Sequence, residues 1–578
     1  MRVNKIDSEA FCQGKVFILR YNNLMENRNR NIGDIKLPAG IPVWGWVSII
    51  LLIAVVWKSI WLSVGAFPFN SDEAITGLMA RHILQGERPI FFYGQSYMGS
   101  LDAFLTAGLF TILGESVLTI RVLQVFLYNC TIISTAWLGR KLTGGWGTGL
   151  LAAMFLAVPV VNTTLYTTVT LGGYGEALLL SNIAFLCAMR LISGSDRSSP
   201  GRDILVTGVM GFVTGLGFWV LGLTLVSTIP AVFFASLAFW KRRKTLPGRW
   251  GALLITFTAT FFLGSLPWWF ASIQAGLFTQ IKELFGSAIS VENDNLVVRS
   301  GKHLFYFVFL GLPAAFGLRP PWDVKWLALP LLPIILMIWG WIFWKFPGIY
   351  KKETESFRSG WNMLILSAVL LAAGFVFTSF GLDPSGRYFL PLEVPMALCA
   401  SMVILKAGIH RIIRFAIPAT LIMFAAFGTI QSASAPPWIT TQFDRVSWID
   451  HNYDGELIQF LRSNGENRGY SNYWVAYPLA FLSDEEILFA PRLPYHEDLR
   501  YTSRDDRIPA YTEAVDSSPR TAYITTFNPA LDKALTSGFT RLGVTWQEKT
   551  IGDFHIFYAL SRPVRPAEIQ QELTPFTE

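Results

Sequence analysis

The chain has little charge, cysteine or histidine for its length. Of its 578 residues, 15% are charged, four are cysteine and six are histidine. So few charges exclude a soluble globular protein of ordinary composition. No cysteine pair has the spacing of a disulfide framework or of a zinc site, and the histidines show no metal-ligand spacing. We interpret the cysteines as small buried apolar residues.

Hydrophobic residues, in contrast, are abundant, at 52% of the chain. Apolar runs of roughly 20 residues, enough to cross the hydrocarbon of a bilayer, recur from Trp44 to Ile430 and then stop. This pattern predicts an α-helical polytopic membrane protein in three parts. They are a cytoplasmic N-terminal tail (1–42), a transmembrane domain (43–430) and a small extracytoplasmic soluble α/β domain (431–578).

The net charge of +7 is carried by short clusters of Lys and Arg between the apolar runs. Clusters such as Arg140 with Lys141 indicate membrane topology and not nucleic-acid binding. They predict about 11 spans, a cytoplasmic N-terminus and a C-terminal domain outside, with the lipid bilayer as partner. Two apolar segments, Ser100–Leu113 and His303–Leu318, do not fit this alternation. We expect them to be interfacial or re-entrant helices.

The expected elements follow from apolar run length and periodicity. Spans are predicted over residues 44–66, 118–138, 146–165, 177–191, 204–240 (two spans), 251–270, 326–344, 361–380, 388–405 and 412–430. In the C-terminal part, a helix is predicted over 455–463 and strands over 473–481, 487–490, 521–526 and, as a pair, 544–560.

Two adjacent carboxylates, Asp72 and Glu73, directly follow the first span. They open an amphipathic helix that should run to about Leu84. Acidic side chains at a membrane surface are costly unless they bind or react with something. The alternative is that Ser71 caps this helix and the two acids complement its dipole.

Two later external loops also carry charge. Glu176 follows three glycines at the start of a span, and Arg387 ends the stretch Gly381-Leu382-Asp383-Pro384-Ser385-Gly386-Arg387. The planar guanidinium of Arg387 suits a phosphate, although it could instead reach lipid headgroups or pair with Asp383. Glu176 could be a helix N-terminal charge. Carboxylates in two loops at one membrane face favour a shared site with Asp72.

Together these features resemble the GT-C superfamily of glycosyltransferases over residues 44–430. The features are the Asp72-Glu73 loop, Ala80-Arg81-His82-Ile83-Leu84, Phe92-Tyr93-Gly94-Gln95-Ser96-Tyr97-Met98-Gly99 and the Arg387-Tyr388 pair. The nearest branch is that of protein O-mannosyltransferases and aminoarabinose transferases. The resemblance implies an inverting hexosyl- or pentosyltransferase of the plasma (inner) membrane. It would move a sugar from a polyprenyl-phosphate donor to an acceptor outside.

The resemblance also implies roles for individual residues. Asp72 would be the catalytic base with Glu73 beside it, and Glu176 would assist where aminoarabinose transferases have Asp. A divalent metal ion on Asp72 and Glu176 is left open as a cofactor. Substrate contacts are expected at Arg387, Tyr388, Asp383, Arg81, Lys58, Tyr93, Gln95, Tyr97 and Tyr174.

Two other functions fit the same sequence. A transporter or lipid flippase also has many spans and buried charges, although its charges usually lie near the bilayer midplane and its halves are often repeated. A membrane-anchored binding module would place the activity in residues 431–578. Neither the sugar nor the acceptor, which could be a protein, a lipid or a polysaccharide, is specified by the sequence.

Overall fold

The computed structural model describes residues 41–194, 199–243, 249–285, 295–496, 498–499 and 501–569. The predicted cytoplasmic tail lies outside the described residues except for its last two. Within the described ranges, nine helices are long and apolar enough to cross a membrane. They contain α2 (Val43–Ser63), α5 (Val117–Thr143), α8 (Tyr174–Ile192), α9 (Pro200–Val220), α10 (Leu225–Lys241), α16 (Leu332–Tyr350), α17 (Glu355–Phe377), α18 (Glu393–Lys406) and α19 (Arg411–Ala433).

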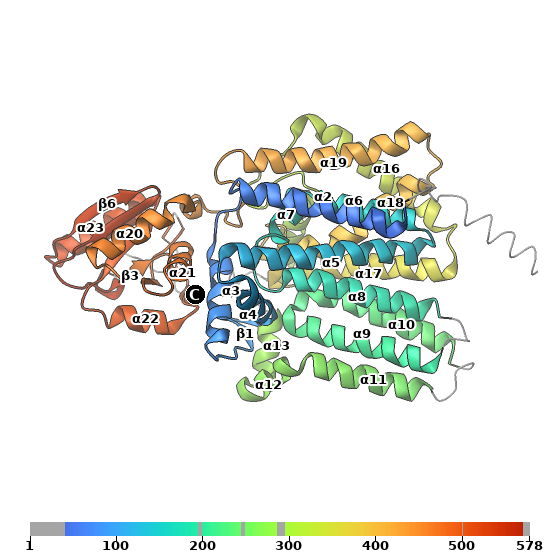
Figure 1. Cartoon of the computed structure of the whole chain (residues 1–578), viewed down its shortest axis with the longest axis horizontal. Helices are drawn as coiled ribbons and strands as arrows, with labels where there is room; N and C mark the ends of the chain where they lie inside the picture. The colour runs from blue at the N-terminus through green and yellow to red at the C-terminus, as the bar shows by residue number, and fades with distance from the viewer. Residues whose placement is uncertain are drawn as a thin grey trace, which may run out of the picture.

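A tenth candidate span is the pair α11 (Arg249–Gly264) and α12 (Leu266–Ala275), which is bent by 65°. The α-helical polytopic fold class predicted from the sequence is therefore confirmed. Figure 1 shows these helices running side by side, with the C-terminal sheet at one end of the bundle.

The predicted span over residues 146–165 is wrong. The structure has two shorter helices there, α6 (Trp146–Ala157) and α7 (Val161–Tyr166). Proline has no backbone N–H to donate, and it disfavours helical backbone at the residue before it. Val158, which precedes Pro159, accordingly leaves the helical conformation, with φ −125° and ψ 73°. This break accounts for the difference between about 11 predicted spans and the nine or ten candidates among the described residues.

The two segments predicted not to cross the membrane are not among the candidate spans. Ser100–Leu113 forms α4 (Leu101–Leu113), a helix of 13 residues. His303–Leu318 lies in α14 (Leu296–Tyr306), the π-helical turn η2 (Phe307–Gly311) and α15 (Leu312–Ala315).

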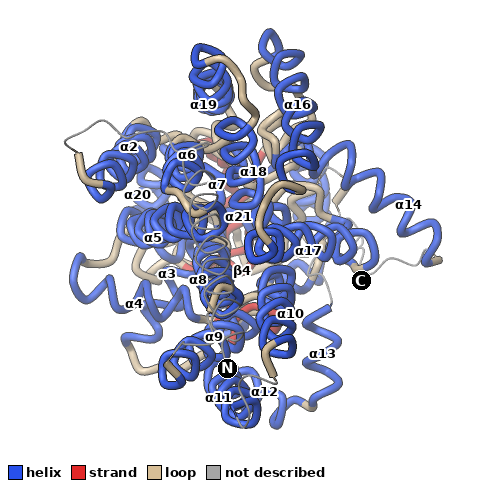
Figure 2. The backbone as a smooth tube through the Cα atoms, turned by 90° about the vertical axis from the view of Figure 1, so that its right-hand side faces the viewer, coloured by secondary structure: helices blue, strands red, loops and turns tan. Residues whose placement is uncertain are grey.

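The bundle has an interior and a lipid-facing rim. The most apolar windows of α8 and of α18 with the turn before it are 72% and 78% buried, whereas those of α2 and α16 are only 22% and 11% buried. Figure 2, which looks along the bundle, shows α8 and α18 near the centre and α2, α16 and α19 towards the edge. Interior helices can therefore carry polar groups away from lipid.

The C-terminal sheet region is a five-stranded sheet with helices packed against it. The strands are β3 (Arg468–Ser471), β4 (Leu488–Pro491), β5 (Ala522–Thr526), β6 (Gln547–Ile551) and β7 (Phe554–Tyr558), in the order β4-β3-β5-β7-β6. β4, β3 and β5 are parallel, and β7 and β6 are antiparallel to their neighbours. The helices are α20 (Asp454–Asn464), α21 (Tyr473–Leu482), α22 (Pro509–Asp516) and α23 (Pro529–Arg541).

The predicted helix over 455–463 and the strands over 487–490, 521–526 and 544–560 are confirmed, but the strand over 473–481 is wrong. That segment is the helix α21, which begins at Asn472, whose side chain accepts a hydrogen bond from the Trp474 N–H. Nearly every residue of α21 is buried. A segment buried on all sides shows no periodicity that separates a helix from a strand.

The sheet region docks on the short elements that follow α2. α3 (Ser71–Leu84) packs against α21, and the hairpin of β1 (Phe91–Phe92) and β2 (Gln95–Gly99) lies beside it. In Figure 1, α21 and α22 face α3, α4 and β1 across this junction. The segment that carries Asp72 therefore lies between the membrane helices and the sheet region.

Candidate active site

Ser71 does not cap the N-terminus of helix α3. Its N-cap is Asn70, whose side-chain oxygen accepts a hydrogen bond from the Glu73 N–H at 3.1 Å. The Ser71 hydroxyl instead donates to the Tyr473 carbonyl at 2.5 Å. The prediction that Ser71 caps the helix is therefore wrong, and Ser71 joins α3 to α21.

The neighbouring carboxylates Asp72 and Glu73 point into different surroundings. Asp72 is partly exposed, and its Oδ1 accepts a hydrogen bond from the Tyr473 hydroxyl at 2.7 Å. Glu73 is fully buried and accepts two hydrogen bonds from Arg121, from Nε at 2.9 Å and from Nη2 at 2.7 Å. Such a fork-to-fork pair uses both carboxylate oxygens. Asp72 is therefore the member of the pair that faces the junction.

Two arginines from different parts of the chain flank Tyr97, in β2. Burial raises the pKa of the Tyr97 hydroxyl, and the positive charges of Arg387 and Arg507 oppose that rise. Asp72 also acts on Tyr97 and on Arg507. Such charge effects reach roughly 10 Å, so Asp72 lies within electrostatic reach of Tyr97 and Arg507. Tyr473 links Asp72 to Arg507 directly, since its hydroxyl donates to Asp72 and the Arg507 guanidinium lies 5.6 Å from the centre of its ring.

Arg387 begins the 3₁₀ turn η5 (Arg387–Leu392), directly before α18. Its Nε lies 2.5 Å from Asp383 Oδ2, and its guanidinium lies 5.0 Å from the centre of the Tyr388 ring. Pairing with Asp383, which the sequence left as an alternative, is thus present. Arg387 also interacts with the Tyr388 hydroxyl.

Six residues predicted from the sequence come together with two that it missed. Arg387 lies within electrostatic reach of Tyr97, Tyr174, Tyr388 and Asp383. We call the whole group the junction cluster: Asp72, Tyr97, Tyr174, Asp383, Arg387, Tyr388, Tyr473 and Arg507. Tyr473 and Arg507 belong to the sheet region, about 400 residues after Asp72, so no sequence spacing could have linked them to it. Gln95 adjoins the cluster because its amide lies 3.1 Å from the Tyr97 hydroxyl.

Arg81 and Tyr93 are engaged elsewhere. Arg81 pairs with Glu115 at 2.8 Å, Asp484 at 3.0 Å and Glu485 at 3.3 Å, which ties α3 to the end of α21. Burial alone would raise the pKa of Glu485, but its hydrogen bonds to groups that include Arg81 lower it to about 2. The Tyr93 hydroxyl donates to Glu87 at 2.5 Å. The pairs of Arg81 with Asp484 and Glu485 hold the sheet region on α3.

Lys58 is also occupied. It is 1% exposed, and its Nζ donates to the Thr167 carbonyl at 2.8 Å and to the hydroxyls of Thr167 and Thr168 at 2.7 Å. These bonds tie α2 to the segment after α7. Within the described part of the chain, Lys58 thus satisfies its ammonium group without reaching the junction cluster.

Glu176 lies beside a different carboxyl group, that of Asp102 in α4. Asp102 accepts hydrogen bonds from Gln124 Nε2 at 2.8 Å and from the Thr170 hydroxyl. Asp72, in contrast, contacts Tyr473. The two residues suggested for a metal ion therefore make separate contacts. Over the described ranges, no group of three or more His, Cys, Asp or Glu side chains is placed to hold a metal.

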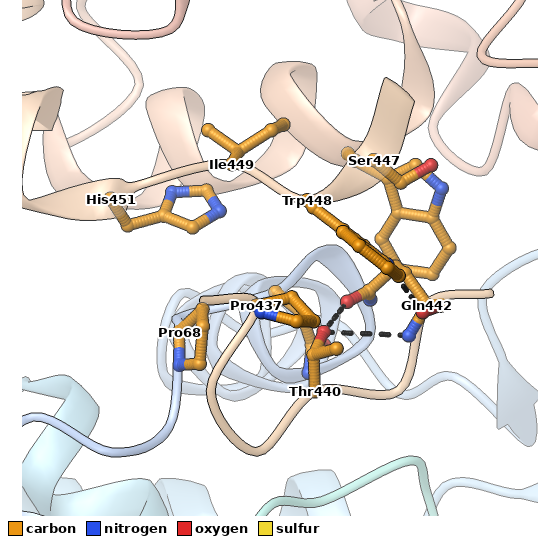
Figure 3. Close-up of a pocket in the computed structure, with 10 residues that line it drawn as sticks. Pro68, Pro437, Thr440, Gln442, Ser447, Trp448, Ile449 and His451 are labelled. Carbon is orange, nitrogen blue, oxygen red and sulfur yellow. Dashed lines mark hydrogen bonds between the residues drawn. The ribbon is translucent and has the colours of Figure 1, made fainter. Parts of the chain in front are cut away.

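A hollow of about 220 Å³ includes Tyr174 of the junction cluster, with Leu223 and Leu390 among its lining residues. Two other hollows include no residue of the cluster. The first, of about 250 Å³, lies where the segment before α3, the linker after α19 and the sheet region meet (Figure 3). Pro68, Thr440, Gln442, Trp448 and His451 are among its lining residues. It does not include Asp72 or either arginine of the cluster.

The second hollow is an apolar groove of about 570 Å³ on the bundle. Its lining residues come mainly from α6, α16, α18 and α19, and include Phe155, Val160, Trp339, Ala397 and Phe424. Glu393, its one carboxylate, is six residues after Arg387 and begins α18. One lining residue of the groove, Glu393, is therefore close in sequence to Arg387.

No protein-family model matches the chain, and no curated protein matches it. Among solved structures, ArnT of Cupriavidus metallidurans bound to undecaprenyl phosphate superposes with a TM-score of 0.57 at 12% identity, over 89% of this chain and 98% of ArnT. The apo form of ArnT gives 0.56 at 11% identity over the same shares. The oligosaccharyltransferase of Archaeoglobus fulgidus in complex with zinc and sulfate gives 0.47 at 12% identity, over 88% and 72% of the two chains. The likeness to ArnT, at 12% identity, shows that the two chains share a fold.

Proposed function

We propose that the chain is a membrane glycosyltransferase that moves a sugar from a polyprenyl-phosphate donor to an acceptor outside the membrane. The observation that carries this proposal is the junction cluster. It combines a partly exposed carboxylate, Asp72, with two arginines at the end of a membrane bundle. A base for the acceptor and cations for a departing phosphate are the groups that such a transfer needs.

The reaction follows from these groups. The acceptor hydroxyl oxygen forms a bond to the anomeric carbon of the sugar while the bond from that carbon to the phosphate oxygen breaks. The electron pair of the broken bond stays on the polyprenyl phosphate, and Asp72 takes the hydroxyl proton. Tyr473 holds Asp72 Oδ1, which directs Oδ2 towards the acceptor. Because the base and the leaving group lie on opposite faces of the sugar, the product has inverted configuration.

The ArnT fold supports a lipid-linked donor, since the ArnT structure contains undecaprenyl phosphate. A long lipid tail stays in the bilayer, so a site at the end of the bundle is where such a donor and an external acceptor can meet. We propose accordingly that the sheet region lies outside the plasma (inner) membrane, where the acceptor is. Hexoses and pentoses are both donor candidates, and the acceptor is a protein, a lipid or a polysaccharide.

The apolar groove is the proposed place for the lipid tail, because it begins near η5, which carries Arg387. Ala397→Trp should fill the groove, since Ala397 is one of its small lining residues. We expect about a tenfold or greater loss of affinity for undecaprenyl phosphate, because the displaced tail loses several buried methylene groups. Val369→Trp, on an exposed face of α17, is the matched control and should bind normally. Binding is measured on purified protein in nanodiscs. Equal affinity of the two variants would show that the tail lies elsewhere.

The function itself is tested with purified protein in proteoliposomes. A panel of labelled polyprenyl-phosphate hexoses and pentoses is incubated with membranes from cells that lack the chain, and transfer of label is measured. Transfer of one sugar, with release of polyprenyl phosphate, is expected. Movement of intact lipid-linked sugar across the bilayer without any transfer would instead identify a flippase, the alternative left open by the sequence.

A further inference from the structure

Arg507 reaches from the sheet region into the membrane half of the site. It lies between the turn η8 (Ser503–Asp505) and α22. Its Nη1 donates to the Gly94 carbonyl at 2.9 Å, and its guanidinium lies 5.6 Å from the centre of the Tyr473 ring. With the Gln95 amide oriented so that its nitrogen donates to Tyr97, its oxygen accepts from Arg507 Nη2 at 2.8 Å. Arg507 is thus fixed against the hairpin that carries Tyr97.

The hairpin leaves room for this approach because residue 94 is a glycine. A Cβ at that position would lie 2.5 Å from the Arg507 Cδ, closer than two carbon atoms can come. Gly94 also has φ +70°, a conformation that side chains disfavour. The absence of a side chain at Gly94 is therefore what allows Arg507 to lie here.

Arg507 has no carboxylate in a direct ion pair among the described residues, unlike Arg121 and Arg387. Arg121 has Glu73 and Arg387 has Asp383. Arg507 is held by neutral oxygens, and among the described residues it makes no ion pair within 4 Å. Its Nε is buried and has no hydrogen-bond partner there. Arg507 as a whole is only half-buried, but an Nε shielded from water without a partner is costly unless an acceptor such as an anion joins it.

Two acids act on Arg507 without a direct ion pair. Burial lowers the pKa of the Arg507 guanidinium, but nearby groups that include Asp72 and Asp505 raise it overall. Burial raises the pKa of Asp505 to about 7, although Arg507 and His496 act to lower it. Asp72 must stay available to the acceptor hydroxyl. Among the described residues, Arg507 is therefore the arginine of the junction cluster that has no direct ion-pair partner.

A departing phosphate needs such a cation. The donor is a phosphodiester with one negative charge, and the polyprenyl phosphate that leaves gains a second one as the bond to the sugar breaks. A single arginine already paired with Asp383 matches little of this charge. Tyr97 connects the two arginines: its hydroxyl lies 3.1 Å from the Gln95 amide that contacts Arg507, and the charge of Arg387 acts on it.

We propose that Arg507 is the second phosphate-binding residue of the site, and that with Arg387 it holds the phosphate of the lipid-linked donor between the two halves of the protein. This inference rests on the proposed glycosyltransferase function. It makes the sheet region part of the donor site, so a bundle without this region would bind the carrier poorly. A phosphate held on the acceptor would use the same chemistry, and the experiment separates these two sources.

The test measures binding of undecaprenyl phosphate, without acceptor, to the full-length protein in nanodiscs. Arg507→Gln should weaken binding by about 10- to 100-fold, the range for loss of a charge-assisted hydrogen bond. Arg507→Lys keeps the positive charge but not the planar guanidinium, so it should lose less affinity for undecaprenyl phosphate than Arg507→Gln. Arg462→Gln is the control, because it removes a cation of the sheet region that is paired with Glu486. This variant should bind undecaprenyl phosphate as the wild type does.

A second variant avoids removing the arginine. Gly94→Ala keeps Arg507 but pushes it away from the hairpin, so carrier binding should fall while the protein keeps its unfolding temperature within a few degrees. In a transfer assay, Arg507→Gln should raise the KM for the donor and leave the KM for the acceptor unchanged.

Each outcome decides the proposal. Unchanged carrier binding in a folded Arg507→Gln protein would overturn the proposal. A rise confined to the KM for the acceptor would also overturn it, and would show that Arg507 binds a phosphate on the acceptor. If the wild type itself failed to bind the carrier, the glycosyltransferase function would fail before this inference was reached. Carrier binding by the wild type together with loss in both Arg507→Gln and Gly94→Ala would support it.

Discussion

Asp72→Asn is expected to lower sugar transfer by about 10²- to 10⁴-fold, the usual contribution of a general base. The amide cannot take the acceptor proton, but its oxygen can still accept the hydrogen bond from Tyr473 that Asp72 Oδ1 accepts at 2.7 Å. The fold should therefore remain intact, and so should affinity for undecaprenyl phosphate. Transfer is measured as initial rate with saturating donor, and the carrier affinity is measured separately.

Tyr473→Phe is the companion variant for Asp72. It removes the hydroxyl that holds the carboxylate but leaves the base itself, so the rate should fall by less than in Asp72→Asn. If Asp72→Asn kept more than about a tenth of the wild-type rate, Asp72 would not be the base. The junction cluster would then bind the donor without supplying the proton acceptor.

Glu73→Gln, at the residue after Asp72, should mainly lower the stability of the folded protein. It leaves the Arg121 guanidinium buried without a counter-charge, because Glu73 is its bidentate partner at 2.7 and 2.9 Å. Breaking a buried ion pair by removing one partner costs about 3–5 kcal/mol. We expect a lower unfolding temperature by differential scanning fluorimetry, with any loss of transfer following the loss of folded protein.

The double variant Glu73→Leu with Arg121→Met provides the control. Replacing both members of a buried pair with apolar residues of similar size removes the unpaired charge and often restores stability. The double variant should therefore unfold at a higher temperature than Glu73→Gln and should recover transfer. A stable, folded Glu73→Gln protein with no transfer would instead give Glu73 a direct part in the chemistry.

The fold class could be predicted because it depends on local features. Apolar runs of membrane-spanning length mark most of the helices without reference to their neighbours. The prediction of one span over residues 146–165 is wrong because Pro159 interrupts the helix within a continuous apolar run. The strand predicted over residues 473–481, which are the helix α21, is wrong for a different reason. Burial on every side hides the helical period that an amphipathic segment shows.

The site could be predicted only in its membrane half. Asp72 stands out because acidic side chains at a membrane surface are costly unless they bind or react with something, and Arg387 stands out because its guanidinium suits a phosphate. Which of Asp72 and Glu73 faces the junction depends on Arg121 in α5, and the sequence gives no sign of that pairing. Tyr473 and Arg507 join the cluster through the docking of the sheet region on α3, which depends on tertiary contacts such as that of Ser71 with the Tyr473 carbonyl.

The most direct measurement is a cryo-EM structure of the full-length protein with undecaprenyl phosphate. The account predicts phosphate density beside Tyr97, within hydrogen-bonding distance of Arg387 and Arg507, and lipid density continuing into the groove that Ala397 lines. Phosphate density at Lys58 or at the hollow beside Trp448, away from both arginines, would contradict it.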